Sequence, residues 1–398
     1  MSDDPLRQLL RGVDRVVPED DFAERIRSGD KLRVKLGLDP TAPSVTLGWA
    51  VVLRKLRQFQ DLGHTAVLIV GDFTAQVGDP SGKSETRKRL TAEQVAAFAE
   101  PLLDQFRKIL APEPLEIRYN SEWLAPLDMA DVLDLTSKVT VAQMLERGDF
   151  AKRFETGTPI SVMEFMYPLL QAYDSVAVRA DVELGGADQL WNLMMGRVIQ
   201  ERSGQRPQVA LTMPLLIGID GHQKMSQSLG NYIGIEDPPA EMFGKTMRIP
   251  DELMIEWFRL TTDVPDDEIL RLAEGLADGT VHPGDLKRRL AREIVTQYWG
   301  DEAAAEAEEE FNRVFRDHRA PDDVPTWPLP SDDPVWLPGL LRDAGLVTSS
   351  SEARRLLAQG AVKLDGNKLE TDSVPRDELT GRVVQVGKRR FVRFTAEA

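Results

Sequence analysis

The stretches Leu32-Arg-Val-Lys-Leu-Gly-Leu-Asp-Pro-Thr41 and Thr65-Ala-Val-Leu-Ile-Val-Gly-Asp72 decide the fold. Residues 32–38 predict a short apolar strand, and residues 65–72 predict a fully apolar strand, which is typical of a strand buried in a parallel sheet. Between them, residues 47–62 carry apolar side chains at helical spacing, and Gly63 provides a stop after the helix. Strand, helix and strand in this order predict a βαβ unit, and the polar turn 39–44 joins its first strand to its helix.

The same alternation of strands and helices continues to about residue 230. Later strand candidates lie at Leu115–Tyr119, Val182–Gly186 and 208–219, with helical segments between them. We therefore predict an α/β fold over residues 1–230, built on a Rossmann-like doubly wound parallel sheet.

Beyond this domain the pattern changes twice. Residues 231–319 are mostly helical and contain the acidic run Glu306–Glu310. Residues 320–337 are predicted to form an extended linker, because their first fifteen positions hold five prolines and four aspartates.

The last segment, 338–398, predicts a small α+β module. Ser349 and Glu352 can form a capping box at the start of a helix, and Asp365-Gly366 is a strong hairpin turn. From Pro338 onward eleven basic residues face eight acidic ones, whereas the whole chain has a net charge of −16. This asymmetry indicates either a basic module on an acidic body or a solvated basic face without a ligand.

Composition excludes several kinds of protein. The 398 residues include no cysteine, so disulfides, thiolate metal sites and cysteine nucleophiles are excluded. No apolar run approaches the ~18–20 residues that a membrane helix needs. The first residues show no basic segment followed by an apolar stretch, so we expect no signal peptide and a cytoplasmic location.

Two polar loops leave alternatives open when each is considered alone. Residues 39–49 lie before a helix N-terminus, which suits a phosphate, yet the same residues also make ordinary turns. Residues 78–87 approach a P-loop, but Val77 stands where that pattern needs glycine, so a P-loop is excluded. Lys83 and Arg87 could clamp a polyphosphate by charge, or they could belong to a solvated surface loop.

Considered together, several motifs are informative. A sheet that opens with Asp39-Pro-Thr and Leu47-Gly48, and is followed by Lys224-Met-Ser-Gln-Ser228, resembles the class I aminoacyl-tRNA synthetases. Within that class the chain is similar to the tyrosyl-tRNA synthetases, and the basic tail resembles the RNA-binding module of the bacterial enzymes, a fold shared with a small-subunit ribosomal protein. The blocks that carry this likeness are Gly37–Thr41, Gly78–Gly82, Tyr167–Asp174 and Gly185–Gln189.

The resemblance implies a role for each motif residue. Tyrosine would be bound by Asp39, Thr74, Asp79, Tyr167, Gln171, Asp174 and Gln189. Within this set, Asp79, Tyr167 and Gln171 would hold the substrate ammonium, Asp174 the phenol and Gln189 the carboxylate. ATP would be bound by Thr41, Gly48, Gly186, Asp188, Lys224 and Met225. Residues acting on the phosphates would be Thr46, Trp49, Lys83, Arg87, Lys224 and Ser228.

The resemblance also implies partners. ATP would be a substrate that arrives with Mg²⁺, and no dedicated protein metal site is expected. The chain would form a homodimer through the connective insertion 115–195 of a catalytic domain 1–230. The helical anticodon-region domain 231–319 and the module 338–398 would then bind tRNA(Tyr), with no role for a membrane. The RNA-binding residues of the module would be Arg354, Arg355, Lys388, Arg389 and Arg390.

The chain departs from the family in its signatures. The two histidines of the first signature are replaced by Thr46 and Trp49, and Gln227 replaces the second lysine of the other signature. A hydroxyl and an indole N–H can still donate hydrogen bonds to phosphates, but with different reach. A third departure is Lys35, where many relatives place a tyrosine that contacts the substrate phenol.

Two functions follow as hypotheses. The first is a tyrosine–tRNA ligase, slowed by its altered phosphate donors. The alternative is a synthetase-like paralogue with weak or no aminoacylation, which binds RNA or a modified tyrosine for a role outside translation. The unaltered amino-acid motif residues favour the first.

Overall fold

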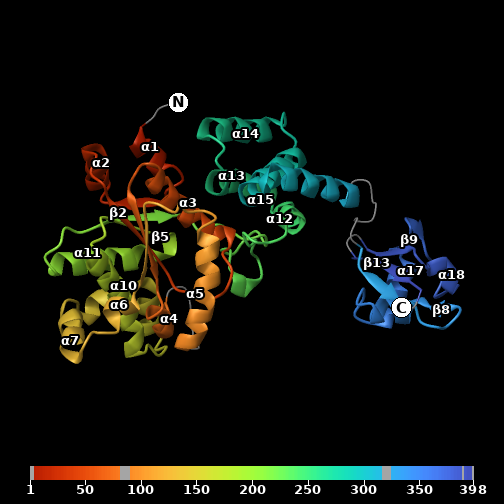
Figure 1. Ribbon diagram of the computed structural model, residues 1–398, viewed down its shortest axis with the longest axis horizontal. Coiled ribbons are helices and arrows are strands. Elements are labelled where there is room, and N and C mark those ends of the chain that lie inside the picture. Colours follow the sequence, from red (N-terminus) through yellow and green to blue (C-terminus); the bar gives the residue numbers. More distant parts are fainter. Residues whose placement is uncertain (1–3, 81–89, 316–323, 388–389, 397–398) are drawn as a thin grey trace. The chain divides into compact units, whose positions relative to one another are not determined.

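The structure is a computed structural model of the chain and describes residues 4–80, 90–315, 324–387 and 390–396. Contacts divide the chain into two compact units, Met1–Pro238 with Lys245–Leu290 and Pro239–Gly244 with Ala291–Ala398. Each unit is described by itself below, and both are drawn in Figure 1.

The first unit is built on a six-stranded sheet with the strand order β1-β6-β5-β2-β3-β4. The central strands pair in parallel, and β1 is an antiparallel edge strand. The α/β fold class with a doubly wound parallel sheet is therefore confirmed. The strands are β1 (Arg15–Val17), β2 (Arg33–Leu38), β3 (Thr65–Val70), β4 (Leu115–Tyr119), β5 (Val182–Gly186) and β6 (Val209–Met213).

The predicted βαβ unit forms as expected. The helix α3 (Leu47–Asp61) joins β2 to β3, and it buries an apolar face that includes Leu53, Leu56 and Phe59. Gly63 adopts a positive φ of 86° directly after the helix, a conformation that glycine reaches without steric cost. The strand order reverses between β2 and β5, so the carboxyl ends of these strands frame a binding crevice.

Helices cover the sheet (Figure 1). The helix α3 packs on β2 and β3, and α11 (Leu190–Arg202) packs on β5 and β6 and against α10 (Val162–Val178). The other helices of this unit are α1 (Pro5–Leu10), α2 (Glu19–Ser28), α4 (Thr74–Val77), α5 (Ala92–Phe106), α6 (Ser121–Leu124), α7 (Met129–Ser137), α8 (Val141–Met144), α9 (Gly148–Glu155), α13 (Met254–Thr261), α14 (Asp266–Asp278) and the 3₁₀ turns η1 (Ala187–Gln189), η2 (Gln227–Leu229) and η3 (Asp251–Leu253).

Two predicted boundaries differ from the structure. The strand predicted over 208–219 ends as β6 at Met213, because Pro214 has no N–H to continue the ladder. The helical segment predicted as 231–319 is divided between the two units. The reason is that α13 packs on α3 and α14 packs on α13, which ties both helices to the sheet-bearing unit.

The second unit contains helices and the C-terminal module. The second unit includes α12 (Pro239–Thr246) as far as Gly244 and α15 (Pro283–Phe315) from Ala291 onward, and α15 bends at Gly300. The module holds a sheet of order β10-β9-β12-β13-β7 and the pair β11-β8. Its strands and helices are β7 (Thr326–Pro328), β8 (Val335–Trp336), α16 (Leu337–Asp343), α17 (Ser350–Ala358), β9 (Val362–Leu364), β10 (Asn367–Lys368), β11 (Ser373–Val374), α18 (Arg376–Leu379), β12 (Val383–Val386) and β13 (Arg390–Thr395).

The module resembles the predicted one, with two differences. The predicted linker 320–337 contains β7 and β8, which pair with β13 and β11, so part of it belongs to the folded module. Prolines at the edge of a sheet are compatible with such pairing, because an edge strand needs donors on one side alone. Only one of the two hydrogen bonds of the capping box forms. The Ser349 hydroxyl accepts from the Glu352 N–H, but the Glu352 carboxylate accepts from Thr348 and not from the Ser349 N–H.

The Asp365-Gly366 turn is as predicted. Both residues have positive φ, and the turn joins β9 to β10 as a hairpin. Buried apolar residues from both strands and helices, among them Leu341, Leu357 and Phe394, form the core of the module. Across the described parts of both units, none of the helices has the length and apolar character needed to span a membrane.

Candidate active site

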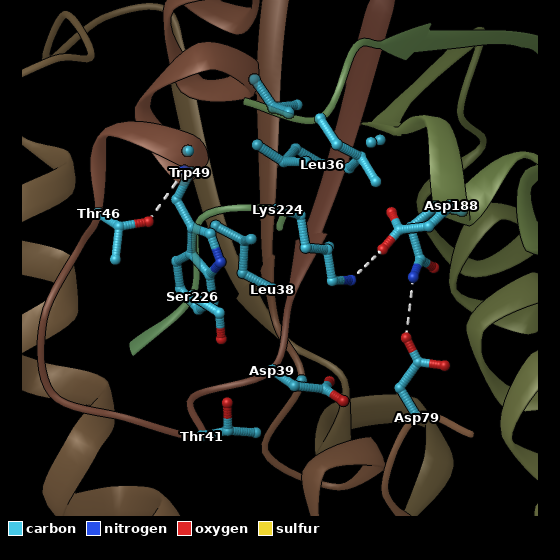
Figure 2. A pocket seen from close by; sticks show the side chains of 18 of the residues that line it. Leu36, Leu38, Asp39, Thr41, Thr46, Trp49, Asp79, Asp188, Lys224 and Ser226 are labelled. Atoms are coloured by element: carbon cyan, nitrogen blue, oxygen red, sulfur yellow. Dashed lines mark hydrogen bonds and ion pairs between the residues drawn. The ribbon is translucent and has the colours of Figure 1, made fainter. Parts of the chain in front are cut away.

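A pocket of about 780 Å³ opens at the carboxyl ends of β2 and β5, where the strand order reverses (Figure 2). Parallel strands bring side chains from distant parts of the chain to this edge of the sheet. The predicted site residues that line it are Asp39, Thr41, Thr46, Gly48, Trp49, Thr74, Asp79, Tyr167, Gln171, Asp174, Gly186, Asp188, Gln189, Lys224, Met225 and Ser228.

Asp39 lines the pocket directly after the end of β2. Its carboxylate accepts hydrogen bonds from the Thr74 hydroxyl at 2.7 Å and from the Tyr167 hydroxyl at 2.9 Å. Gly71 is needed for this arrangement, since a Cβ on it would lie 2.0 Å from the Asp39 carboxylate. Burial raises the pKa of Asp39 to about 7, and the nearby carboxylates of Asp79 and Asp174 add to the rise.

Asp174 is held by two donors that the sequence did not reveal. The Trp123 indole N–H donates to one carboxylate oxygen at 2.8 Å, and the Asn120 amide donates to the other at 3.3 Å. The same Asn120 amide also donates to Thr74 at 2.9 Å. Asp174 is buried, and this burial raises its pKa to about 7 against the opposing effects of Lys35 and the two donors. A carboxylate with spare lone pairs at this depth suits a phenol O–H.

Asp79 and Gln189 form a second pair of binding groups. The Gln189 amide donates to Asp79 at 2.8 Å, and its oxygen accepts from Asn192 at 2.9 Å. Arg147 is buried behind them, 3.8 Å from Asp79, and donates to Asn192 at 3.2 Å. A carboxylate and an amide side by side can bind the ammonium and the carboxylate of an amino acid.

Gln171 lies on α10 and also lines the pocket. Tyr167, Gln171 and Asp174 are about one helical turn apart, so they share one face of this helix. The amide oxygen of Gln171 is buried and has no hydrogen-bond partner among the described residues. Lys35 does not line the pocket: it is fully buried and pairs with Glu183 at 2.8 Å.

The opposite end of the pocket is formed by the start of α3 and the segment after β6. Thr46 is the N-cap of α3, and its hydroxyl oxygen accepts from the Trp49 backbone N–H at 3.3 Å. Figure 2 shows the Trp49 side chain beside Ser226 and Lys224 directed at Asp188. The Lys224 ammonium and the Asp188 carboxylate form an ion pair at 2.7 Å. A helix N-terminus, a lysine and hydroxyls together suit a polyphosphate.

Gln227 connects the two loops at this end. Its amide donates to the Ser44 carbonyl, which lies just before α3. The residue that replaces a signature lysine thus ties the segment after β6 to the loop after β2. Ser226 and Ser228 share a hydrogen bond of 2.9 Å in the same segment.

Not every predicted site residue can be placed. Lys83, Arg87, Lys388 and Arg389 lie outside the described residues. Arg354, Arg355 and Arg390 lie on the exposed surface of the C-terminal module, in the other unit. Arg354 pairs with Asp372 at 2.9 Å, and Arg390 lies 3.6 Å from Glu352.

The site residues missed in the sequence differ in how they could have been found. Asn120 directly follows a predicted strand, and the rule that ligands bind at strand carboxyl ends could have identified it. Trp123, Arg147 and Asn192 carry no comparable local signal, because their roles arise from contacts between segments far apart in sequence.

Comparison with known proteins agrees with this geometry. The model of the family described as tRNA synthetases class I (W and Y) matches residues 27–316. The crystal structure of tyrosyl-tRNA synthetase from Archaeoglobus fulgidus, complexed with L-tyrosine, is 26% identical with a TM-score of 0.62, covering 76% of this chain and 98% of that chain. The fold and site thus define a class I aminoacyl-tRNA synthetase.

Sequence relatives narrow the class. The tyrosine–tRNA ligase of Moorella thermoacetica is 54% identical over 393 residues, which cover 98% of this chain and 95% of that protein. The tyrosine–tRNA ligase of Thermotoga maritima is 50% identical over 393 residues, which cover 99% and 98%. The chain belongs to the tyrosine–tRNA ligase family, and the resemblance found in its motifs is confirmed.

Proposed function

We propose that this chain activates tyrosine with ATP and transfers the tyrosyl group to the 3′ end of tRNA(Tyr). The observation that carries the proposal is the buried carboxylate of Asp174 at one end of the pocket and the pair Asp79 and Gln189 beside it. These groups match the phenol, the ammonium and the carboxylate of one amino acid. The full-length similarity to tyrosine–tRNA ligases supports the same activity.

The first step joins the amino acid to the nucleotide. An oxygen of the tyrosine carboxylate attacks the α-phosphorus of ATP, the bond to the β-phosphate oxygen breaks, and pyrophosphate leaves. We assign Gln189 to the substrate carboxylate, Asp188 and Gly186 to the ribose, and Thr41, Gly48 and Met225 to the nucleotide. Magnesium would arrive with ATP as its counter-ion. No protein nucleophile is needed, because positioning and electrostatic stabilisation lower the barrier.

The phosphate end supplies donors for the leaving pyrophosphate. The Thr46 hydroxyl, the Trp49 indole N–H, Lys224 and Ser228 surround this end of the pocket, and we assign Lys83 and Arg87 to the same task. Lys224 is paired with Asp188, so nucleotide binding would have it exchange a carboxylate for a phosphate. In the second step a terminal ribose hydroxyl of tRNA attacks the adenylate carbonyl, and AMP leaves.

Two further parts of the chain support the remaining assignments. The connective insertion 115–195 exposes five large apolar side chains, as a homodimer interface would: Met129, Leu133, Val141, Phe154 and Val162. In the C-terminal module we assign Arg354, Arg355, Lys388, Arg389 and Arg390 to tRNA phosphates, and the whole reaction to the cytoplasm. Deleting 338–398 should weaken tRNA binding and reduce its dependence on salt.

The test of the main proposal is ATP–pyrophosphate exchange over a panel of amino acids, including ring-modified tyrosines, followed by aminoacylation of tRNA(Tyr). Strong exchange that depends on tyrosine, and charging of the tRNA, are expected. Absence of exchange with every amino acid would instead favour the synthetase-like paralogue that binds RNA. Exchange confined to a modified tyrosine would assign the chain a role outside translation.

A further inference from the structure

A buried polar cluster contacts Gln171 at the amino-acid end of the pocket, and the reaction does not use this cluster directly. It consists of Lys35 on β2, Glu183 on β5, Ser175 on α10 and Gln208 before β6. Lys35 is 0% exposed and Glu183 is 1% exposed. Burying two charges requires that each keep its partners, and hydrophobic residues of similar volume often stabilise a fold equally well. Stability alone therefore does not account for an ion pair at this depth.

Each oxygen of Glu183 has a defined set of donors. One oxygen accepts from the Lys35 ammonium at 2.8 Å and from the Gln171 side-chain amide at 3.3 Å. The other accepts from Ser175 at 3.1 Å and from the Gln208 amide. Lys35 also donates to Ser175 at 2.7 Å and to the backbone carbonyl of Gln171 at 2.9 Å. The cluster thus holds both the backbone and the side chain of Gln171.

The neighbouring helix leaves room for this cluster. Gly196 on α11 faces it, and a Cβ at this position would lie 2.4 Å from the Gln208 amide nitrogen and 3.1 Å from the Glu183 carboxylate. A side chain here would therefore displace the donors of Glu183, which explains why the helix carries glycine at this point.

The chemistry of the contact fixes which way the Gln171 amide points. An ionised carboxylate is an acceptor alone, so the side of the Gln171 amide that faces Glu183 has to be the NH₂. The amide oxygen is then turned away from Glu183. It is buried and finds no partner in the described part of the chain, while Gln171 lines the pocket. A preorganised acceptor in this position would meet the substrate ammonium, whereas a reversed amide would present N–H groups to a cation.

We propose that Glu183, held in place by Lys35, is a positioning residue that orients the Gln171 amide so that its oxygen accepts a hydrogen bond from the substrate ammonium. This rests on the assignment of Gln171 to the ammonium under the proposed function. Lys35, which stands where many relatives place a phenol-contacting tyrosine, thereby acts on the ammonium end of the amino acid. It acts through the side chains of Glu183 and Gln171 and does not touch the substrate.

The experiment compares two ligands that differ in the ammonium alone. Tyrosine and 3-(4-hydroxyphenyl)propionate share the phenol and the carboxylate, but the second lacks the amino group. The variants are Glu183→Gln, whose amide can also donate and so no longer fixes Gln171, and the charge-neutral pair Lys35→Met with Glu183→Gln. The double variant leaves no buried lysine without its partner. It therefore keeps the test valid if the single variant fails to fold.

The matched control is Glu164→Gln, which breaks another buried ion pair, Arg153–Glu164, outside the lining of the pocket. Dissociation constants for both ligands are measured by calorimetry on full-length protein. In the Glu183 variants we expect tyrosine to bind about 10–100-fold more weakly, with less than a roughly 3-fold change for the propionate. The control should shift both ligands equally or not at all.

Three outcomes overturn the inference. Equal weakening of both ligands in the Glu183 variants would show a merely structural role. An unchanged affinity for tyrosine would show that the Gln171 amide needs no orientation. If the wild-type chain binds the propionate but not tyrosine, the pocket has no ammonium site and the inference is wrong. A wild-type chain that binds neither ligand would contradict the proposed function itself.

Discussion

The two ends of the pocket are built in different ways. At the amino-acid end, Asp174 is buried and Asp39 is half-buried, and each has donors from the protein: Asp39 from Thr74 and Tyr167, and Asp174 from Asn120 and Trp123. At the phosphate end the charged groups are exposed and pair with one another, as Lys224 does with Asp188 at side-chain exposures of 48% and 27%. The amino-acid end is therefore formed before the substrate binds, whereas the phosphate end has to exchange partners when ATP binds.

The difference follows from the elements that carry each end. Tyr167, Gln171 and Asp174 project from one face of a long helix, and Asp39 follows a central strand. The phosphate end depends on the segment between β6 and α12, which the structure describes in full and whose only helix or strand is the short 3₁₀ turn η2. The Gln227 amide of this turn donates to the Ser44 carbonyl. Sites on helices and strands are held more accurately than sites on loops. Selectivity should therefore depend on the first end and the rate of activation on the second.

The largest effect should come from the phosphate end. Trp49→Phe removes the indole N–H and keeps the aromatic ring. If this donor stabilises the transferring phosphates, kcat for tyrosine-dependent pyrophosphate exchange should fall about 10²-fold, with KM for tyrosine unchanged. Thr46→Ser is the matched control, because it keeps both the hydroxyl and the cap of α3. A raised KM for tyrosine with unchanged kcat would contradict the division between the two ends.

The next effect concerns selectivity at the amino-acid end. Asp174→Asn replaces a charged acceptor by a neutral amide, so the preference for tyrosine over phenylalanine should fall about 10–100-fold. Steady-state exchange with both amino acids gives this ratio. Tyr167→Phe is the comparison, since it acts on the Asp39 side of the pocket and should weaken both amino acids alike. If Asp174→Asn also weakens both equally, Asp174 does not bind the phenol.

How much of this could be predicted from sequence depends on where the information lies. The βαβ unit was predictable because β3 is a nearly continuous apolar run, β2 carries apolar residues alongside Arg33 and Lys35, and the helix between them keeps its apolar period. The edge strand β1 was not predicted, because it covers only three residues and forms by pairing with β6, nearly two hundred positions away. The strands β7 and β8 were missed within a proline-rich segment for the same reason, since pairing with β13 and β11 creates them.

The site shows the same division. Its motif residues could be named from the family resemblance, and the pocket brings sixteen of them together. Their supporting partners could not, because the contact of Asp79 with Arg147 and that of Asp174 with Trp123 exist only in the folded chain. Lys35 is the clearest case: the sequence marks it as a departure, but only its burial against Glu183 indicates what it contacts.

A smaller effect should appear as pH dependence at the amino-acid end. Burial raises the pKa values of Asp39 and Asp174 to about 7, so below this pH both groups are largely protonated in the free pocket. A bound ammonium favours the ionised form of Asp39, and a phenol O–H that donates to Asp174 favours the ionised form of that carboxylate. Both pKa values should therefore fall, so tyrosine binding should release protons. Affinity should fall up to about 10-fold per pH unit for each coupled proton as pH drops below 7, and level off above it.

Calorimetry in buffers with different ionisation enthalpies counts the released protons. Asp39→Asn should reduce this count, since it removes one of the two titrating groups next to the substrate. Tyrosine binding that is independent of pH between 6 and 8 would show that these carboxylates remain ionised in the free protein.

The smallest effect, on stability, separates the two ends once more. Trp123→Phe leaves one oxygen of the buried Asp174 without its donor, which should lower the free energy of unfolding by about 1–3 kcal/mol. Lys224→Met breaks an ion pair that is open to solvent, so the corresponding loss should stay below about 1 kcal/mol. Urea unfolding followed by circular dichroism measures both. Because Lys224 is assigned to the phosphates, its variant should lose activity while remaining nearly as stable as the parent. Equal losses of stability would mean that the phosphate end is as firmly held as the amino-acid end.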